Sequence, residues 1–464
     1  MAAPGDHARV GDLAADRHRL IERYGAPDLT PSTAADHLAA LPRARFASVA
    51  YRRPGPLVQP RGGFPSAAKQ RALTLAFDAA GADFIPLTVD SHTRHNDHDT
   101  AARLLAASLA EGRDLLNGYP LVAHGVTTTR GLFEGIERPV SLRHGTPDAR
   151  LLAELALASG ITEIEGGGLS YSLPYSRAFP VERALVHWQY VDRLCAEVGP
   201  ADAPVQRESF GPLTATLVPP VITVVVQLCE LLLAAEQGVT AFTVSYGQTG
   251  SFEQDLAIAT VLRAHAADLL ARFGFAVDVR LAYHQWMGAF PAEPSLAWQL
   301  IAVSAAISGL VGADKVVVKT PDEAVGIPSI ENNAASVRAV RYVLDMFPAC
   351  RPLSNEVVEC ERDLLDREVT EVLTRILDHP APSFLSAVHH AVLDGVIDVP
   401  FAPHEQNAAA LIAVRGTGRR IRVLEPGSVP LSTESMRRER ELRGPKSEDG
   451  PLWEGLLRDI RVLT

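Results

Sequence analysis

Short runs of apolar and β-branched residues recur along the chain, and most of them end at polar or glycine-rich residues. Runs of this length, bounded in this way, are typical of buried strands. The chain contains nine of them: Leu57–Gln59, Asp83–Thr88, Pro120–Ala123, Pro139–Leu142, Ile161–Ile164, Val205–Phe210, Ala241–Ser245, Val277–Tyr283 and Lys315–Val318. Helical stretches lie between many of them, namely Ala101–Glu111, Arg150–Ala158, Phe252–Phe273 and Ser295–Leu310. Strands that alternate with helices predict a parallel sheet.

This alternation predicts an α/β protein built as a (β/α)8 TIM barrel. Nine runs are one too many, so we expect one of them to be a loop or an extra strand. Residues 1–50 are expected to form an N-terminal helical extension and residues 51–335 the barrel. Residues 336–464 are expected to form a smaller C-terminal α+β extension, with helices to about Val392 and short extended pieces at Val396–Phe401 and Ile421–Leu424. No Gly-x-Gly-x-x-Gly follows the first strand, which argues against a dinucleotide-binding fold.

Composition and charge narrow the class of partner. The chain has 464 residues and a formal net charge of -11, which disfavours nucleic acid and anionic membranes. The most apolar stretch, Val221–Ala235, is interrupted by Gln227 and Glu230 and is too short to span a bilayer, so we expect a buried helix. The charged tail Ser435–Gly450 is expected to be a solvated surface segment.

Cysteine usage indicates a reducing compartment. The four cysteines form no Cys-x-x-Cys pair and are too few for a disulfide framework: Cys195, Cys229, Cys350 and Cys360. The segment Met1–Arg19 has no continuous apolar core of the kind found in signal peptides. We therefore predict a cytoplasmic protein.

Active-site residues of such barrels stand where the strands end. The strand ends here carry Arg61, Asp90–Arg94, His124, Arg143 with His144, Glu165 with Gly166–Gly168, Phe210, Tyr246, His284 and Lys319. Three arginines and a lysine at one mouth predict an anion-binding pocket, because the planar guanidinium binds carboxylate in bidentate fashion. A substrate with two anionic groups would fit. The alternative is that each arginine pairs with a nearby carboxylate and only stabilises the fold.

The run Glu165-Gly-Gly-Gly-Leu-Ser-Tyr-Ser-Leu-Pro-Tyr175 is a second signal. Three glycines allow close approach of the backbone to a ligand. A carboxylate beside an arginine-rich pocket could receive an ammonium group or act as a base, with Tyr171 and Tyr175 nearby. The alternative is a surface loop whose tyrosines only pack.

Two further patterns are weaker. Lys319 and Glu323 could bind ribose hydroxyls or a cofactor, although their spacing alone fits an ordinary strand-to-helix turn. His92, His95 and His98 resemble metal ligands, but their spacing matches no familiar metal site, so no metal is predicted. Asp90-x-His92 lacks the glycine of the Asp-x-His-x-x-Gly motif of B12-binding domains.

Taken in order, the motifs resemble the large epsilon subunit of glutamate mutase, also called methylaspartate mutase. The resemblance runs from about Gln59 to Val429. It is carried by Pro60-Arg-Gly-Gly63, Thr93-Arg-His-Asn96, Leu115-Leu-Asn-Gly118, Leu142-Arg-His-Gly-Thr-Pro-Asp148, Glu165-Gly-Gly-Gly168, Phe210-Gly-Pro-Leu213, Leu217-Val-Pro-Pro220, His284-Gln-Trp-Met-Gly288 and Val318-Lys-Thr-Pro321.

The resemblance implies an isomerase that interconverts L-glutamate and (2S,3S)-3-methylaspartate by a radical mechanism. It implies adenosylcobalamin, shared with a small cobalamin-binding subunit in an assembly of two large and two small chains. Glu165 and Arg94 would be catalytic, and Glu165 would hold or deprotonate the substrate amino group. The expected substrate-binding residues are Arg61, Arg94, Arg143, His144, Glu165, Tyr171 and Tyr175. The expected coenzyme-binding residues are Gly63, Asn117, Pro174, Phe290, Lys319, Glu323 and Ile327.

Two other hypotheses remain open from the sequence. One is a cobalamin-independent barrel lyase or isomerase that acts on a related dicarboxylate, which a metal site at His92, His95 and His98 would favour. The other is a non-catalytic binding homologue. Loss of an arginine or of Glu165 would favour the second, and none of them is lost.

Overall fold

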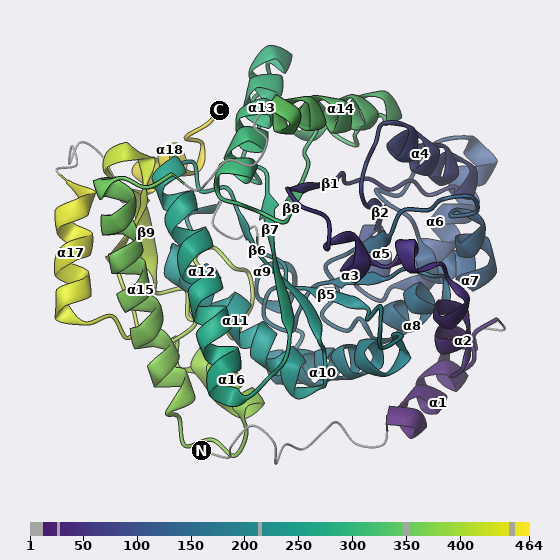
Figure 1. Cartoon of the computed structure of the whole chain (residues 1–464), viewed down its shortest axis with the longest axis horizontal. Coiled ribbons are helices and arrows are strands. Elements are labelled where there is room, and N and C mark those ends of the chain that lie inside the picture. Colours follow the sequence, from purple (N-terminus) through teal and green to yellow (C-terminus); the bar gives the residue numbers. More distant parts are fainter. Residues whose placement is uncertain (1–12, 26–27, 212–215, 347–352, 445–450) are drawn as a thin grey trace.

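The computed structural model describes residues 13–25, 28–211, 216–346, 353–444 and 451–464. Eight parallel strands form its centre (Figure 1). They are β1 (Leu57–Gln59), β2 (Ile85–Thr88), β3 (Val140–Arg143), β4 (Glu163–Glu165), β5 (Gln206–Glu208), β6 (Ala241–Gly247), β7 (Asp278–His284) and β8 (Lys315–Val317). Each strand pairs with its neighbour in sequence from β2 to β8, and β8 pairs with β1.

The sheet closes between its first and second strands through a few backbone hydrogen bonds. The Asp83 N–H donates to the Val58 carbonyl over 2.9 Å, and the Thr88 N–H donates to the Gly62 carbonyl over 3.1 Å. Closure removes the exposed sheet edge. The predicted (β/α)8 barrel is therefore confirmed.

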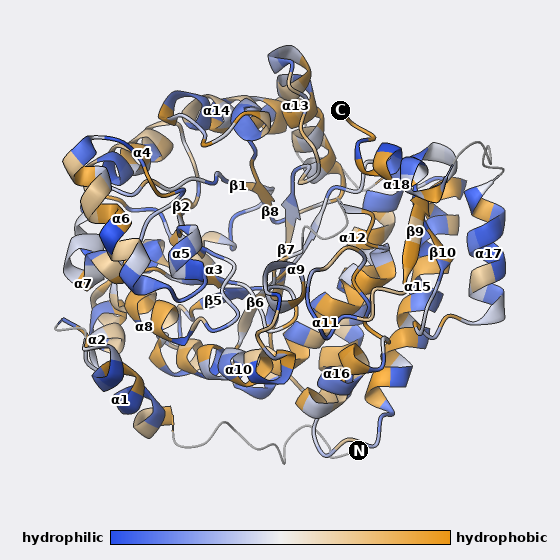
Figure 2. Cartoon of the chain, turned by 180° about the vertical axis from the view of Figure 1, so that it is seen from behind, coloured by the Kyte–Doolittle hydropathy of each residue, from blue (hydrophilic) through white to orange (hydrophobic). Residues whose placement is uncertain are grey.

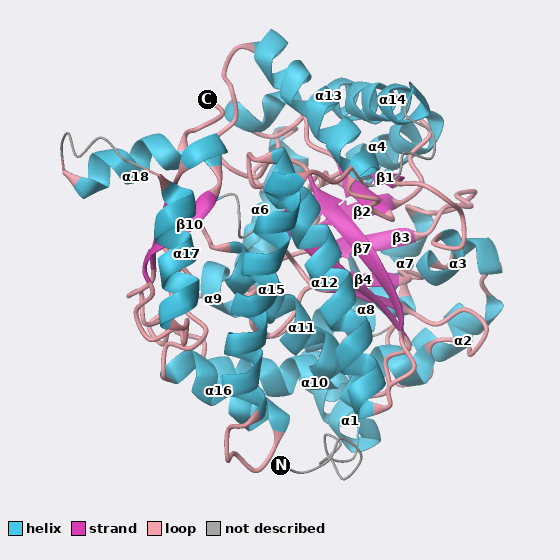
Figure 3. Cartoon of the chain, turned by 60° about the vertical axis from the view of Figure 1, so that its left-hand side comes forward, coloured by secondary structure: helices cyan, strands magenta, loops and turns pink. Residues whose placement is uncertain are grey.

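Helices surround this barrel on its outer face (Figures 1 and 3). The principal ones are α4 (Ala67–Ala79), α6 (His98–Glu111), α7 (Leu121–Gly131), α8 (Arg150–Ala158), α10 (Val181–Val198), α11 (Pro220–Glu236), α12 (Phe252–Phe273), α13 (Pro294–Leu310) and α14 (Ile330–Met346). Short helices follow β2, β4 and β8, namely α5 (Ser91–Arg94), α9 (Ser172–Tyr175) and the 3-10 turn η3 (Pro321–Ala324). The four helical stretches predicted between strands lie in α6, α8, α12 and α13.

Two predicted extended segments are wrong. Pro120–Ala123 is the extra ninth run, and it begins helix α7. Extended pairing stops at Tyr119, which bridges Val89, because the next residue is a proline with no N–H to donate. Val396–Phe401 forms no strand either, since the Val399 N–H donates to the Asn407 side chain over 2.9 Å instead of to a neighbouring strand.

Further elements precede and follow the barrel. Helices α1 (Leu13–Tyr24), α2 (Thr33–Ala40) and α3 (Ala47–Ala50) come first, as predicted. The later elements are α15 (Glu356–Leu377), α16 (Phe384–Leu393), the antiparallel hairpin β9 (Ile412–Arg415) and β10 (Ile421–Glu425), α17 (Thr433–Arg443) and α18 (Leu452–Ile460). Helix α15 packs against α11 and α12 on the outside of the barrel. The domain boundaries remain a proposal, and α14 continues across residue 335.

The charged tail is an ordered helix over much of its length. Helix α17 is largely hydrophilic in Figure 2, yet Ser435 and Glu439 on it are buried. The expectation of a wholly solvated segment is therefore wrong for residues 435–444, because one face of the helix packs on the hairpin. Residues 445–450, like Cys350 and the end of the Phe210–Leu213 motif, lie outside the described residues.

Helix α11 is the buried apolar helix that was predicted. Every residue from Pro220 to Ala235 is buried, and Gln227 forms hydrogen bonds near the ends of β5 and β6. Gln227 donates to the Phe210 carbonyl over 3.1 Å and accepts from the Ser245 N–H over 2.7 Å. Within the described ranges, no helix combines the length and apolar character that crossing a bilayer requires.

Candidate functional site

Parallel strands end at the same face of a barrel, and this chain places its charged residues there. Arg143, Glu165, Glu208 and His284 are the last residues of β3, β4, β5 and β7. Arg61 follows β1, Arg94 ends the short helix after β2, and Lys319 follows β8. Segments far apart in the sequence thus meet at one end of the barrel (Figure 1).

Arg143 is fully buried and already paired. Its Nη1 donates to Glu208 Oε1 over 2.9 Å and also to Glu165 Oε1, while its Nη2 donates to Glu208 Oε2 over 3.1 Å. Burial alone would lower the pKa of Arg143, but the two carboxylates outweigh it and raise that pKa. Arg143 therefore fixes Glu165 in place, which is the pairing that the sequence left open as an alternative.

The sequence analysis did not predict a column of buried charged side chains next to Arg143, formed by Glu208, Lys315 and Glu163. The Lys315 ammonium donates to both oxygens of Glu163, over 2.9 and 2.8 Å, and to Glu208. Arg143 and Lys315 lower the pKa of Glu208 well below its ordinary value although burial opposes this. One feature of the sequence indicates that Glu163 also points into the barrel. Glu163 and Glu165 are two positions apart, and alternate residues of a strand point to the same face.

Arg61 and Arg94 differ from Arg143 in having no carboxylate partner among the residues that the structure describes. The Arg94 Nε donates to the Val89 carbonyl over 2.7 Å, and the Arg61 Nη1 lies 3.6 Å from the Met287 sulfur. Burial, with repulsion from Arg61, lowers the pKa of Arg94. Two neighbouring guanidinium groups without counterions are arranged to receive an anion.

Glu165 is held on both oxygens. Oε1 accepts from Arg143, and the Tyr171 hydroxyl donates to Oε2 over 2.5 Å. Burial raises the pKa of Glu165, partly offset by Arg143. Tyr175 packs edge-on against Tyr171, with ring centroids 5.9 Å apart, and lies close to Arg94 and Gly145. The run from Glu165 is therefore buried as far as Leu173 and reaches the surface at Tyr175, so it is not a surface loop over most of its length.

His144 is buried beside these residues as a neutral ring. Its Nδ1 accepts from the Thr146 N–H over 3.1 Å, which assigns the ring proton to Nε2. Burial, together with Arg94 and Arg207, lowers the pKa of His144 well below its ordinary value. The ring stacks on Trp188 at a centroid distance of 5.7 Å. His144 is therefore a neutral polar group next to the arginines.

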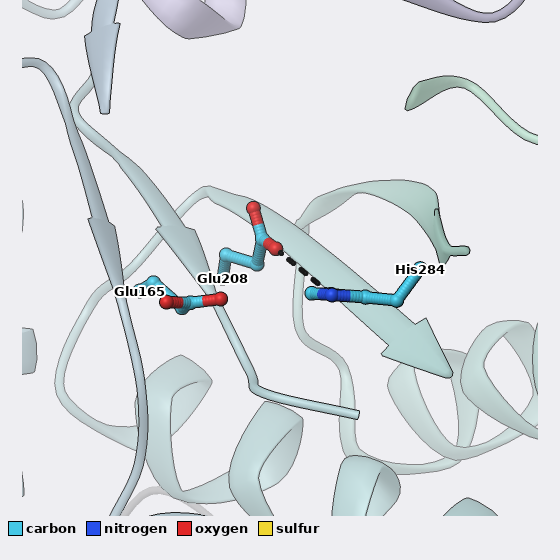
Figure 4. Close-up of side chains that lie close together, drawn as sticks. All are labelled: Glu165, Glu208 and His284. Atoms are coloured by element: carbon cyan, nitrogen blue, oxygen red, sulfur yellow. Dashed lines mark ion pairs between the residues drawn. The ribbon is translucent and has the colours of Figure 1, made fainter. Parts of the chain in front are cut away.

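Glu165, Glu208 and His284 lie close enough together to be considered as metal ligands (Figure 4). The Glu208 carboxylate points at His284, with a 3.6 Å separation from Nε2. However, Arg143 already binds both carboxylates, and Lys315 also binds Glu208. A metal cation at this position would be repelled by these two positive charges.

The three histidines after β2 do not come together as a metal site in the described part of the chain. His92 lies 3.4 Å from Asp97, His95 is exposed, and His98 packs edge-on against Tyr24. The described residues therefore give no support from these histidines to a cobalamin-independent lyase or isomerase.

The expected coenzyme residues lie in the segments, partly loops and partly short helices, that come after five different strands. Lys319 is buried, its ammonium 2.6 Å from Glu323, and burial lowers its pKa. Phe290 is buried, Pro174 is half-buried, and Asn117 and Ile327 are exposed. A Cβ on Gly63 would stand 2.2 Å from the Thr88 carbonyl oxygen, so only glycine fits there.

Fold and site together define a (β/α)8-barrel protein that gathers arginines and buried carboxylates at the carboxyl ends of its strands. Residues 44–449 match the family model described as methylaspartate mutase E chain. The chain belongs to this family of isomerases, so the resemblance read from the sequence is confirmed.

Named relatives agree with the family assignment. The glutamate mutase epsilon subunit of Treponema denticola is 40% identical over 81% of this chain and 78% of that protein. The Desulfitobacterium hafniense subunit of the same name is 40% identical over 87% and 85%. The Halobacterium salinarum subunit is 39% identical over 86% and 84%.

Proposed function

We propose that this chain is the catalytic subunit of a coenzyme B12-dependent carbon-skeleton mutase that interconverts L-glutamate and (2S,3S)-3-methylaspartate. Family membership supports the reaction class. The observation that carries the substrate is the contrast between the paired Arg143 and the carboxylate-free Arg61 and Arg94. Unpaired arginines beside a buried glutamate match a ligand that carries both carboxylates and an ammonium group.

The charges of the site complement this substrate. Three carboxylates, Glu163, Glu165 and Glu208, face two cations, Arg143 and Lys315, which leaves the buried column with one excess negative charge. Arg61 and Arg94 add two positive charges. These side chains together thus carry one positive charge, and a dicarboxylic amino acid carries one negative charge. Binding neutralises the site, which matters because unbalanced charge is costly where water is excluded.

Each group has a distinct role in this proposal. Arg61 and Arg94 bind the substrate carboxylates, and Arg143 contributes through its remaining donors while it orients Glu165. Glu165 accepts a hydrogen bond from the substrate ammonium, or its proton, while Tyr171 and His144 border the same position. Tyr175 covers the carboxylate end. Such a clamp keeps the two halves of the substrate in register while the carbon skeleton rearranges.

Adenosylcobalamin fits the remaining expected residues. Side chains of mixed polarity, from the buried Lys319 and Phe290 to the exposed Asn117 and Ile327, follow several strands and suit a group much larger than the substrate. Lys319 and Glu323 would hold its adenosyl part, with Gly63, Asn117, Pro174, Phe290 and Ile327 around it. When bound, the coenzyme supplies the radical that removes a hydrogen atom from the substrate.

A small cobalamin-binding subunit is the partner that this proposal requires, in an assembly of two large and two small chains. The relatives' designation as epsilon subunits supports a multi-subunit enzyme. We also propose a cytoplasmic location, which the free thiols of Cys195, Cys229 and Cys360 support because such compartments keep thiols reduced.

Reconstitution tests the proposal. The purified chain is mixed with a glutamate mutase small subunit, adenosylcobalamin and L-glutamate in dim light, and products are separated by chiral chromatography. We expect 3-methylaspartate only when every component is present. Absence of product with several small subunits, and no cob(II)alamin signal, would refute the proposal.

A further inference from the structure

Two buried side chains of opposite charge, Arg207 and Glu230, hold the loop between Glu165 and Tyr171 by hydrogen bonds. Arg207, on β5, donates from Nη2 to the Gly166 carbonyl over 2.8 Å and from Nη1 to the Ile164 carbonyl. These two carbonyls flank Glu165 in the chain. Arg207 itself is anchored by Asp192 on α10, 2.6 Å from its Nε. The backbone on either side of Glu165 is thus fixed to the outer layer of the barrel.

Glu230 binds the other end of the loop, at Leu169 and Ser170. This buried residue of α11 accepts on Oε1 from the Leu169 N–H over 2.9 Å and from the Ser170 N–H over 2.8 Å. On Oε2 it accepts from the Ser170 hydroxyl over 2.9 Å and from the Ser209 hydroxyl. These four hydrogen bonds satisfy the buried carboxylate, so it does not require a cationic partner.

The fit between this carboxylate and the loop is tight. A Cβ on Gly167 would stand 2.0 Å from the Glu230 carboxyl carbon, closer than any real contact. Glu230 therefore requires a glycine at the middle position of the triplet. Glu230 is also the one charged residue in the apolar stretch Val221–Ala235 of α11. Burying a carboxylate in an apolar helix costs free energy, which indicates that Glu230 has a role in the protein.

We propose that Glu230 is a positioning residue for amine recognition: by holding the backbone of residues 167–170 it sets the Tyr171 hydroxyl against Glu165. This inference rests on the proposed function, in which Glu165 receives the substrate ammonium. Glu230 does not touch the substrate. Its loss lets the loop lift, breaks the Tyr171–Glu165 contact, and weakens binding of the amino group while Arg61 and Arg94 still bind carboxylates.

The test compares two ligands in the reconstituted enzyme. L-Glutamate reports on the whole site, and glutarate, which has both carboxylates but no amino group, reports on the arginines alone. The ratio of the glutamate KM to the glutarate inhibition constant measures amine recognition. For Glu230→Ala we expect this ratio to rise about tenfold, the effect of weakening one hydrogen bond to a charged group. Glu230→Gln, which keeps an acceptor for the two amides, should restore most of the difference.

Two further variants separate positioning from folding. Glu154→Gln is the matched control, since Glu154 is equally buried and bonded to Arg17 and Tyr190 on the outer side of the barrel. It should lower the melting temperature and leave the ratio unchanged. Gly167→Ala retains Glu230 and forces the loop away from it, so it should raise the ratio even if Glu230→Ala folds poorly.

The outcomes distinguish this inference from the proposed function. Equal weakening of both ligands in Glu230→Ala and Gly167→Ala would overturn the positioning role, provided that Glu165→Gln raises the ratio. If Glu165→Gln itself leaves the ratio unchanged, the amine contact of the proposed function fails, and the role of Glu230 fails with it.

Discussion

Arg94 and Arg143 both belong to the predicted anion pocket, yet replacing each with methionine should have different consequences for the stability of the folded protein. Arg143 neutralises two buried carboxylates, Glu165 and Glu208. Arg94 has no carboxylate partner among the described residues, and its burial disfavours its own charge. Arg143 therefore stabilises the fold, whereas in the proposed function Arg94 stays charged and without a carboxylate partner so that it can bind the substrate.

The magnitudes follow from these contacts. Arg143→Met leaves the buried Glu165 without a cationic partner and Glu208 with Lys315 alone, a change that costs about 3–5 kcal/mol. For a chain of this length that lowers the melting temperature by roughly 3–5 °C. Arg94→Met loses the hydrogen bond to Val89, worth about 1 kcal/mol, but also removes an unpaired charge, so the two effects nearly cancel. Its catalytic loss is large, because two charge-assisted bonds of about 1.5 kcal/mol each correspond to roughly a hundredfold in kcat/KM.

Thermal unfolding and turnover of the two variants together form the assay. We expect Arg94→Met to melt within about 1 °C of the wild type with kcat/KM reduced roughly a hundredfold. Arg143→Met should lose both stability and activity. Comparable destabilisation by both substitutions would refute the distinction between a structural and a ligand-binding arginine, as would an Arg94→Met enzyme with nearly full activity.

Three other variants test separate parts of the site and the fold. Tyr171→Phe removes a hydrogen bond that lowers the pKa of Glu165, so the acid limb of the kcat/KM profile should move to higher pH; an unmoved limb would contradict this. Glu323→Gln leaves Lys319 unpaired and should weaken adenosylcobalamin binding several-fold in a spectroscopic titration, with the glutarate inhibition constant unchanged as the control. Burial raises the pKa of Glu439 to about 7, so the wild type should lose stability as the pH rises through 7, and Glu439→Gln should flatten that loss in melting curves.

The sequence revealed the barrel because strand and helix periodicities alternate so regularly. It placed Arg61, Arg94, Arg143 and Glu165 at strand ends, and the structure brings all four to the same end of the barrel. The extra strand at Pro120–Ala123 could not be excluded by pattern, since a short apolar run suits a helix start equally well.

The pairing inside the barrel was beyond the reach of sequence reasoning. Lys315 contacts Glu163 across 152 positions of the chain, and no local pattern announces such a contact. The same holds for Glu230, whose partners Leu169 and Ser170 lie 61 and 60 positions away. Which arginine is paired and which is free depends on these long-range contacts, and only a three-dimensional structure shows them.

The most direct measurement follows one labelled carbon through the reaction. L-Glutamate carrying 13C at C3 is incubated with the chain, a small cobalamin-binding subunit and adenosylcobalamin, and the products are read by 13C NMR. If the glycine half of the substrate migrates from C3 to C4, the label appears in the methyl group of 3-methylaspartate. Label that stays in glutamate, or enters an elimination product without any methyl signal, would contradict the mutase account.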